Sequence, residues 1–252
     1  MNLQAVWTEE LSVKTFESDF MGRWKPAPVL QSMTEAAASH AAHLGVGYYD
    51  LVDENIVWVL SRVKIVWNAV PCQGETLRLH TWPKGLQQKL FFARDFLIDR
   101  PDGLTCIAAS TAWLLVDPIT RRLVLPNALK TPLPEPLGLR ALDEPLEKIA
   151  TNGCLSERLV RTAGYSAVDM LGHTNSARYL DWISDCFSID DYARGFPAWL
   201  QINYSTEVKP GDQISIAAGP SPADPRVTHM LGTNLTTGAR AFEAAVGWHA
   251  EQ

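Results

Sequence analysis

The chain has 252 residues, of which 46% are hydrophobic and 20% charged, and its formal net charge at pH 7 is -6. Two compact domains of roughly 100–130 residues fit this length, and the composition is that of ordinary globular proteins. The acidic balance argues against a nucleic-acid-binding protein, because such proteins usually carry a basic excess.

The cysteines and the N-terminal segment predict a cytoplasmic protein. Cys72, Cys106, Cys154 and Cys186 are widely separated, and no CxxC pair occurs. Such spacing predicts reduced thiols and not a disulfide framework. The beginning of the sequence lacks the basic and apolar regions of a signal peptide, and no apolar run reaches the ~18 residues that a membrane span needs. We therefore expect a cytoplasmic protein with no membrane segment.

The first half of the chain predicts a long helix followed by strands. Apolar residues recur at helical spacing over residues 29–44, and Gly45 is placed to end this helix. The apolar run of residues 57–67 and the alternating pattern of residues 75–80 predict strands on either side of a turn at Gly74.

A proline-rich segment follows the first half. Five prolines lie between residues 126 and 145. Proline cannot join the interior of a sheet, so we expect a stiff, extended connector. We therefore place the N-terminal domain at residues 1–128, the linker at 129–152 and the C-terminal domain at 153–252.

The second half repeats the pattern of the first. The sequence DMLGHT at residues 169–174 matches DFMGRW at residues 19–24, with Asp, Gly and a following polar side chain in the same places. A second helical pattern comes after this match, at Tyr179, Leu180, Ile183 and Phe187. Gly211 then matches the turn glycine Gly74, and a third glycine match precedes the last long strand of each half. Matches in the same order predict a duplicated structural unit.

Each half is thus predicted to be a long helix wrapped by antiparallel strands. Duplicated in one chain, this arrangement is the tandem, or double, hotdog fold of the α+β class. Each sheet alone would leave an edge strand exposed, so we expect the two sheets to form one continuous sheet.

Several common catalytic motifs are absent from the sequence. It has no GxSxG nucleophile elbow, no HExxH zinc motif, no GxxxxGK[ST] phosphate loop and no GxGxxG fingerprint. We therefore expect acid–base chemistry with no covalent serine, no metal and no cofactor.

The second copy of the repeat carries a titratable pair beside a predicted helix start. Asp169 and His173 lie four residues apart, and Asn175 can cap the helix after them. Backbone N–H groups at a helix start can stabilise an oxyanion, and Gly172 lets a substrate approach the backbone closely. The first copy has Arg23 in place of the histidine, and arginine cannot act as a base. We therefore expect one working site, in the second half.

The sequence DMLGHTNSARYLDW at residues 169–182 resembles the D-x-N-G-H-x-N-N-x-x-Y-x-x-W signature of the acyl-ACP thioesterases of plant plastids and bacteria. The resemblance covers essentially the whole chain. It implies hydrolysis of the thioester of fatty acyl-acyl carrier protein (acyl-ACP), which releases a free fatty acid and ends chain elongation. It also implies that Asp169, His173 and Glu207 carry the reaction.

The three candidate catalytic residues have distinct expected roles. Glu207 lies at the end of a predicted strand, and Val70 occupies its place in the first half. We expect Glu207 to activate water as a base, His173 to polarise or protonate, and Asp169 to position the other groups. Leu171 departs from the signature, which usually has Asn there, so an amide is replaced by an apolar side chain.

Further residues are candidates for binding the substrate. Gly172, Asn175 and Leu171 lie beside the expected reaction centre, and Trp24 and Met33 are expected to line an apolar acyl tunnel in the N-terminal domain. ACP is acidic, so docking would need basic side chains. Those available are Arg62, Lys64, Lys84, Lys89, Arg121, Arg122, Arg158, Arg161 and Arg178. We expect no nucleic-acid or membrane partner, and either a monomer or a homodimer.

Two alternative functions stay open. The first is an acyl-CoA thioesterase, in which Arg and Lys side chains would hold the phosphates of coenzyme A. The second is a catalytically weak acyl-binding hotdog protein, and Leu171 is the residue that favours it. A comparison of acyl-ACP with acyl-CoA as substrates separates the first from the main interpretation, and a lack of product would indicate the second.

Overall fold

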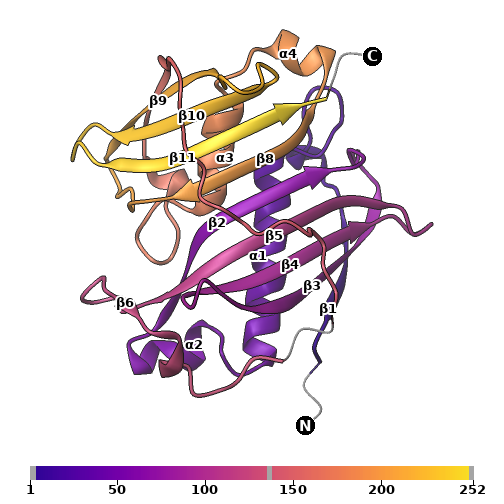
Figure 1. Ribbon diagram of the computed structural model, residues 1–252. Helices are drawn as coiled ribbons and strands as arrows, with labels where there is room; N and C mark the ends of the chain where they lie inside the picture. Colours follow the sequence, from indigo (N-terminus) through magenta and orange to yellow (C-terminus); the bar gives the residue numbers. More distant parts are fainter. Residues whose placement is uncertain (1–3, 135–137, 250–252) are drawn as a thin grey trace. The chain divides into compact units, whose positions relative to one another are not determined.

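The computed structural model describes residues 4–134 and 138–249, so residues 135–137 of the predicted linker lie outside the described residues. The chain divides into two compact units (Figure 1). The first holds the residues up to Trp24, Val29–Val63 and Asn68–Leu146, and the second holds Lys25–Pro28, Lys64–Trp67 and the residues from Glu147 onward. Within the described ranges, no helix is long and apolar enough to cross a membrane.

The first unit is built on one sheet and one long helix, α1. The strands follow the order β1-β3-β4-β5-β2, and β6 pairs with β5. The pairings of β1 with β3, β3 with β4, and β4 with β5 are antiparallel. The elements are β1 (Trp7–Ser12), η1 (Thr15–Glu17), α1 (Pro26–His43), α2 (Tyr48–Leu51), η2 (Val52–Glu54), β2 (Val57–Trp67), β3 (Thr76–Gln87), β4 (Phe91–Asp99), β5 (Thr105–Val116), β6 (Leu123–Val124) and η3 (Pro126–Ala128).

The second unit repeats this plan with a shorter helix, α3. Its strands follow the order β8-β11-β10-β9-β7, and all four pairings are antiparallel. The elements are β7 (Ser156–Thr162), η4 (Tyr165–Ala167), α3 (Ser176–Ser184), α4 (Ile189–Arg194), β8 (Pro197–Tyr204), β9 (Gln213–Pro220), β10 (Val227–Asn234) and β11 (Arg240–Trp248).

A helix packs against the sheet in each unit. In the first, His40 of α1 contacts Arg94 of β4, with 3.0 Å between imidazole Nδ1 and guanidinium Nη1. In the second, the ring of Tyr179 on α3 lies edge-on to Tyr204 of β8 and Phe242 of β11, with centroids 5.3 and 5.6 Å apart. The predicted helix against an antiparallel sheet is therefore present twice.

The alternating strand patterns face the core as predicted. Leu77 and Leu79 on β3, and Ile214 and Ile216 on β9, are all at most 1% exposed. Each such side chain stabilises the fold by about 1.5–3 kcal/mol when it leaves water. The period of two in the sequence thus marks the buried face of the strand in both units.

Backbone hydrogen bonds confirm the internal repeat. The Val13 N–H donates to the Glu75 carbonyl at 3.1 Å, and the Ala163 N–H donates to the Asp212 carbonyl at 2.9 Å. The two acceptors, Glu75 and Asp212, are residues that the sequence comparison matches, because each follows the turn glycine of its own half.

The helix of the second unit ends earlier than its apolar pattern predicts. α3 stops at Ser184, and Phe187 lies beyond it with its ring 5.1 Å from that of Trp248. The reason is local: Ser188 is the N-cap of α4, and its side chain accepts a hydrogen bond from the Asp191 N–H at 3.1 Å. A capping serine favours a new helix start over continuation of the old helix.

The proline-rich segment is tied to the first unit by a buried ion pair. Lys84 Nζ lies 2.9 Å from Asp95 Oδ2, and the two side chains are 6% and 0% exposed. Lys84 also donates to the Leu142 carbonyl at 2.7 Å, and Asp95 accepts from the Ala141 N–H at 2.8 Å. These bonds hold the segment to β3 and β4 at specific atoms.

Candidate active site

The sequence from Asp169 to His173 forms a tight turn in the second unit. The Asp169 N–H donates to the His173 carbonyl at 2.9 Å, and the Gly172 N–H donates to the Asp169 carbonyl at 3.0 Å. Gly172 has a φ of 77°, a left-handed conformation that favours glycine. The Asp169 carboxylate accepts from the Leu171 N–H at 2.9 Å. Asp169 therefore holds the turn that ends at His173, and its role in the reaction stays a prediction.

His173 and Glu207 face each other across this turn. His173 Nε2 lies 3.1 Å from Glu207 Oε2, and the two side chains are 13% and 36% exposed. The next residue, Thr174, donates its N–H to the Val208 carbonyl at 2.9 Å, so a backbone bond fixes the turn beside the glutamate. Glu207 lies in the loop after β8 and not at the strand end that the sequence predicts.

The first copy of the turn has the same backbone and different chemistry. Gly22 also has a φ of 77°, and the Trp24 N–H donates to the Pro71 carbonyl at 2.8 Å. Arg23 stands in the place of the histidine, with its Nε 2.9 Å from the Asp19 carboxylate. Val70 precedes Pro71 as Glu207 precedes Val208, so the predicted correspondence of these two positions is correct. Of the two copies, the second therefore carries the titratable pair.

The start of α3 supplies a backbone donor beside His173. Asn175 is the N-cap, as predicted, and its side chain accepts from the Ala177 N–H at 3.0 Å. The Arg178 N–H donates to the Asn175 carbonyl and so closes the first turn of the helix. In the described part of the chain, the Ser176 N–H at the helix start has no hydrogen-bond partner. The positive end of the helix dipole reinforces this donor.

The helix start of the first copy lacks this donor. The residue 150 positions before Ser176 is Pro26, the first residue of α1, and Pro28 lies two positions further on. Proline has no backbone N–H, although its fixed φ suits the first turn of a helix. α1 can therefore begin normally while offering no hydrogen bond at the place where α3 offers one.

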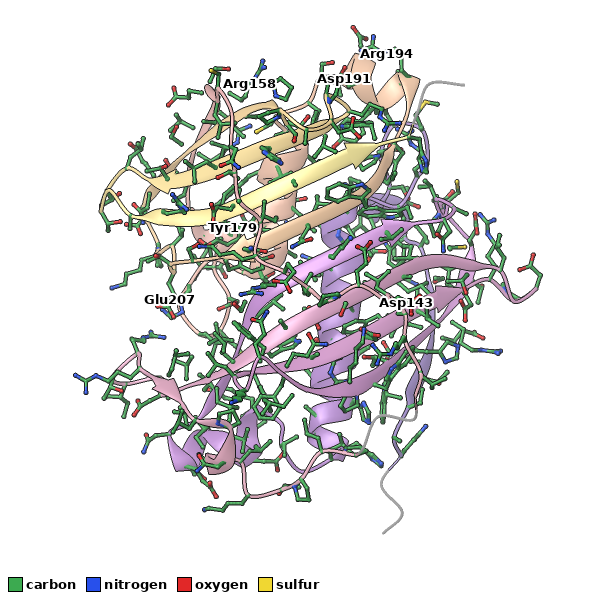
Figure 2. The ribbon with its side chains drawn as sticks, in the orientation of Figure 1. Asp143, Arg158, Tyr179, Asp191, Arg194 and Glu207 are labelled. Atoms are coloured by element: carbon green, nitrogen blue, oxygen red, sulfur yellow. The ribbon has the colours of Figure 1, made fainter. Side chains whose placement is uncertain are left out.

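Tyr179 belongs to the same site, although its periodicity in the sequence marks it only as a helix residue. The side chain is buried at 3% exposure, in the second unit together with Glu207 (Figure 2). Burial raises its pKa, and the carboxylates of Glu207, Asp169 and Asp212 raise it further, while a hydrogen bond from the Val208 backbone opposes the shift. The phenol thus keeps its proton close to the two candidate carboxylates, Asp169 and Glu207. In the sequence, the tyrosine of the D-x-N-G-H-x-N-N-x-x-Y signature is the feature that indicates a place for Tyr179 in this site.

The predicted substrate-binding residues fall into two places. Gly172, Leu171 and Asn175 lie with the catalytic candidates, and the Leu171 side chain is 38% exposed at the tip of the turn. Trp24 and Met33 belong to the first unit and are 0% exposed. Their role as walls of an acyl tunnel stays a prediction.

One basic residue considered for ACP docking is unsuitable. Lys84 is buried in its pair with Asp95, so the expectation that it could face a partner is wrong. Arg161 and Arg178 are about two-fifths exposed and pair with Asp185 at 3.3 Å and Asp181 at 2.8 Å. Among residues 4–134 and 138–249, no three His, Cys, Asp or Glu side chains form a group that could hold a metal ion.

Family models match both units. A model described as the acyl-ACP thioesterase N-terminal domain matches residues 4–127, and one described as the C-terminal domain matches residues 156–250. A palmitoyl-acyl carrier protein thioesterase, chloroplastic, of Arabidopsis thaliana is 26% identical over 192 residues, which are 71% of this chain and 46% of the relative. The chain thus spans about half the length of the curated relatives it matches.

Solved structures share the fold over nearly the whole chain. An acyl-ACP thioesterase from Bacteroides thetaiotaomicron has a TM-score of 0.79 and 25% identity, over 97% of this chain and 98% of that one. A 12:0-ACP thioesterase from Umbellularia californica has a TM-score of 0.80 at 17% identity, over 98% of both chains. The second comparison concerns the fold alone, and together they confirm the predicted tandem hotdog.

Proposed function

Because the chain belongs to the acyl-ACP thioesterase family, we propose that it hydrolyses the thioester of fatty acyl-ACP and releases a free fatty acid. The observation that carries this proposal is the 3.1 Å contact between His173 Nε2 and Glu207 Oε2 beside the start of α3. The matched C-terminal family model covers these residues. Release of the fatty acid would end chain elongation in fatty acid biosynthesis.

The contact supports a water-mediated reaction. Glu207 takes a proton from water, and the water oxygen attacks the carbonyl carbon of the thioester. The Ser176 N–H and the dipole of α3 stabilise the negative charge that develops on the carbonyl oxygen. The proton passes from Glu207 to His173, which gives it to the departing sulfur as the carbon–sulfur bond breaks. The products are a fatty acid and the thiol of the carrier protein.

The carrier protein is an acidic protein that would dock on basic side chains of this chain. Its docking would use cations that are exposed and not held in a buried pair, and Arg158 and Lys89 are examples. A cytoplasmic location is a proposal and not a finding, because the Arabidopsis relative is named as chloroplastic. The monomer or homodimer expected from the sequence is also a proposal.

A second candidate function rests on Leu171. Its exposed apolar side chain stands where the family signature has an amide, so it cannot hydrogen-bond a substrate carbonyl or a carboxylate. This favours slow turnover, or an acyl-binding protein with little hydrolysis. Acyl-CoA hydrolysis is the remaining alternative, and substrate comparison separates it.

The test is release of free thiol from matched acyl-ACP and acyl-CoA substrates. The wild-type chain should hydrolyse acyl-ACP faster than acyl-CoA, and His173→Ala and Glu207→Gln should each lower kcat by about 100-fold or more. Faster turnover of acyl-CoA would show that acyl-CoA, and not acyl-ACP, is the preferred substrate. Stoichiometric acyl-ACP binding without thiol release would favour the acyl-binding function.

A further inference from the structure

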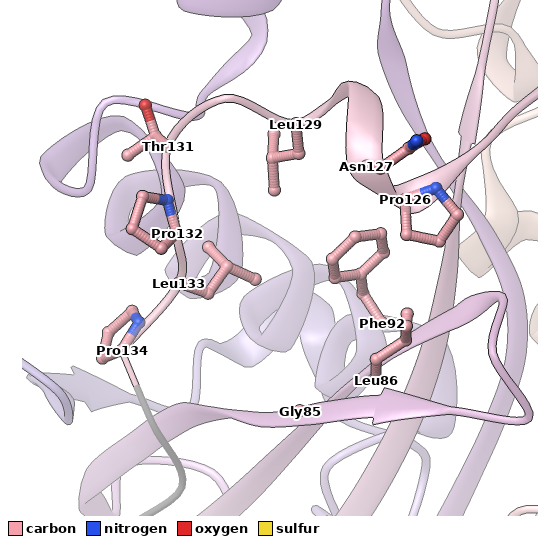
Figure 3. A pocket seen from close by; sticks show the side chains of 10 residues that line it. All are labelled: Gly85, Leu86, Phe92, Pro126, Asn127, Leu129, Thr131, Pro132, Leu133 and Pro134. Carbon is pink, nitrogen blue, oxygen red and sulfur yellow. The ribbon is translucent and has the colours of Figure 1, made fainter.

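The proposed reaction needs a base and an oxyanion donor at a fixed distance from each other. Glu207 lies in the loop after β8, and the Ser176 N–H lies at the start of α3, both in the second unit. An apolar cavity of about 440 Å³ belongs to the first unit, where the β3–β4 hairpin and the proline-rich segment line it (Figure 3). Neither Glu207 nor Ser176 lines this cavity. Contacts among α3, β8 and the loop after β8 must therefore set the distance between base and donor.

The start of α3 is tied to β8 through a tyrosine side chain. Tyr204, the last residue of β8, donates its hydroxyl to the Ser176 carbonyl at 2.9 Å. Ser176 is also the residue whose N–H would stabilise the oxyanion. Such a donor is effective when its position is fixed before the reaction begins. The Tyr204 hydroxyl therefore holds the residue on which the oxyanion donor depends.

A second tyrosine links α3 to the loop that carries Glu207. The Tyr179 side chain is 3% exposed, and its ring packs edge-on against Tyr204 with centroids 5.3 Å apart. Its hydroxyl forms a hydrogen bond with the backbone of Val208, the residue after Glu207. Val208 is completely buried, so water cannot take the place of this hydroxyl.

Val208 is held from a second side by the turn of the histidine. The Thr174 N–H donates to the Val208 carbonyl at 2.9 Å, and Thr174 directly follows His173. One residue next to the glutamate is thus bonded both to α3 and to the residue next to the histidine. These two bonds fix the backbone on either side of the 3.1 Å contact between His173 and Glu207.

The first copy of the repeat forms the same turn without either hydroxyl. The residues 150 positions before Tyr179 and 137 positions before Tyr204 are Val29 and Trp67. Pro71 takes the place of the residue after the glutamate, and it has no N–H for a tyrosine to hold. The turn therefore folds without these groups, and they occur together in the copy that carries the titratable pair.

We propose that Tyr179 and Tyr204 are positioning residues of the candidate active site. Tyr204 fixes the start of α3, which carries the oxyanion donor, and Tyr179 fixes the loop that carries the proposed base. The proposal rests on the proposed thioesterase function, and it gives neither hydroxyl a part in proton transfer. Because the two rings pack against each other, the two anchors together set one geometry.

The test measures thiol release from acyl-ACP by full-length Tyr179→Phe and Tyr204→Phe, since each change removes one hydroxyl and keeps the ring. Each should lower kcat by about tenfold or more and leave KM within about twofold, because the reacting groups lose their alignment while the binding surface stays. Assays far below the unfolding temperature keep each variant folded, so that a lower kcat reports geometry and not the loss of folded protein.

Tyr192→Phe is the matched control. Tyr192 lies on α4, at the end of the second unit opposite Glu207 (Figures 1 and 2). This variant loses a hydroxyl in the same unit, and its kcat should match the wild type. An equal fall of kcat in Tyr192→Phe would mean that the position of the lost hydroxyl does not matter, and the positioning roles would be wrong.

Amide hydrogen exchange tests the anchor of the loop without turnover. The Val208 amide proton should exchange at least about tenfold faster in Tyr179→Phe than in the wild type and in Tyr192→Phe, because it loses its hydrogen-bond partner. A wild-type chain that hydrolyses no thioester overturns the proposed function, and the exchange rates still test the anchor. Normal hydrolysis with an unchanged kcat in both site variants, or unchanged exchange at Val208, overturns the positioning roles and leaves the function intact.

Discussion

At the scale of single residues, the two turns form a natural pair of experiments. Gly172 and Gly22 have the same φ of 77°, and a Cβ on either glycine would meet no atom within 4 Å. The penalty for alanine at each position therefore comes from the left-handed backbone alone. The two turns differ in the residue after the glycine, which is His173 in one and Arg23 in the other.

Gly172→Ala and Gly22→Ala should therefore cost the same stability and differ in activity. Each should lower the free energy of unfolding by about 1 kcal/mol, because alanine is disfavoured at positive φ. Only Gly172→Ala should lower kcat, since only its turn carries the histidine of the proposed mechanism. Urea unfolding and thiol release measure the two effects. An equal loss of kcat in both variants would mean that activity follows general stability and not the geometry of this turn.

His40 is a buried histidine whose hydrogen bonds fix its protonation. A guanidinium can only donate, so His40 Nδ1 accepts from Arg94, and Nε2 carries the proton and donates to the Gln4 carbonyl at 2.9 Å. The pKa of His40 is lowered from 6.5 to about 4, mainly by burial and to a smaller extent by the charges of Arg94 and His43. The hydrogen bond to Gln4 acts in the opposite direction.

This histidine should make the fold less stable in mild acid. Between pH 6.5 and about 4 the unfolded chain binds a proton at His40 and the folded chain does not, so its contribution is complete above pH 6.5 and is lost as the pH falls. The loss is about 3 kcal/mol near pH 4. Urea unfolding from pH 7 to 4 should show a steeper decline for the wild type than for His40→Gln. Parallel declines would show that carboxylates alone govern the acid sensitivity.

At the scale of elements, two ion pairs of the first unit differ mainly in burial. Lys84 and Asp95 are almost completely buried, whereas Lys130 is 76% exposed in its 2.8 Å pair with Glu54. Removal of one partner from a buried pair leaves an uncompensated charge, while an exposed pair contributes little. The buried pair also fastens the proline-rich segment through the Leu142 carbonyl and the Ala141 N–H.

Lys84→Met should lower the free energy of unfolding by about 3 kcal/mol, and Lys130→Met by at most about 0.5 kcal/mol. Methionine keeps the apolar stem of the lysine, so the difference reports the charge and its bonds. Limited proteolysis should also cut the segment after Leu129 sooner in Lys84→Met. If the two variants unfold at the same urea concentration, the buried pair does not hold the segment in solution.

At the scale of the whole molecule, the repeat explains which features could be predicted from the sequence. The sequence matches show that Val70 corresponds to Glu207 and Arg23 to His173, because a duplicated backbone keeps its turn glycines. The signature includes Tyr179, but helical periodicity alone could not place it near Glu207, because the position of Glu207 depends on the loop after β8.

The repeat also explains why we assign the proposed catalysis to the second turn only. The first copy keeps the backbone of the turn, but it has Arg23, Val70 and, at the helix start, Pro26. Two of these differences remove the acid–base pair. The third removes the N–H that would stabilise an oxyanion, so the first copy lacks both parts of the proposed mechanism.

Rebuilding the pair alone should therefore fail to create a second site. In the His173→Ala background, Arg23→His combined with Val70→Glu should leave thiol release at the level of His173→Ala itself, because Pro26 still offers no donor to the oxyanion. A single-turnover assay detects a rate only slightly above background, and circular dichroism checks that the variant is folded. Recovery of a substantial rate would mean that the histidine and glutamate are sufficient without a helix N–H, and that the role assigned to Ser176 is wrong.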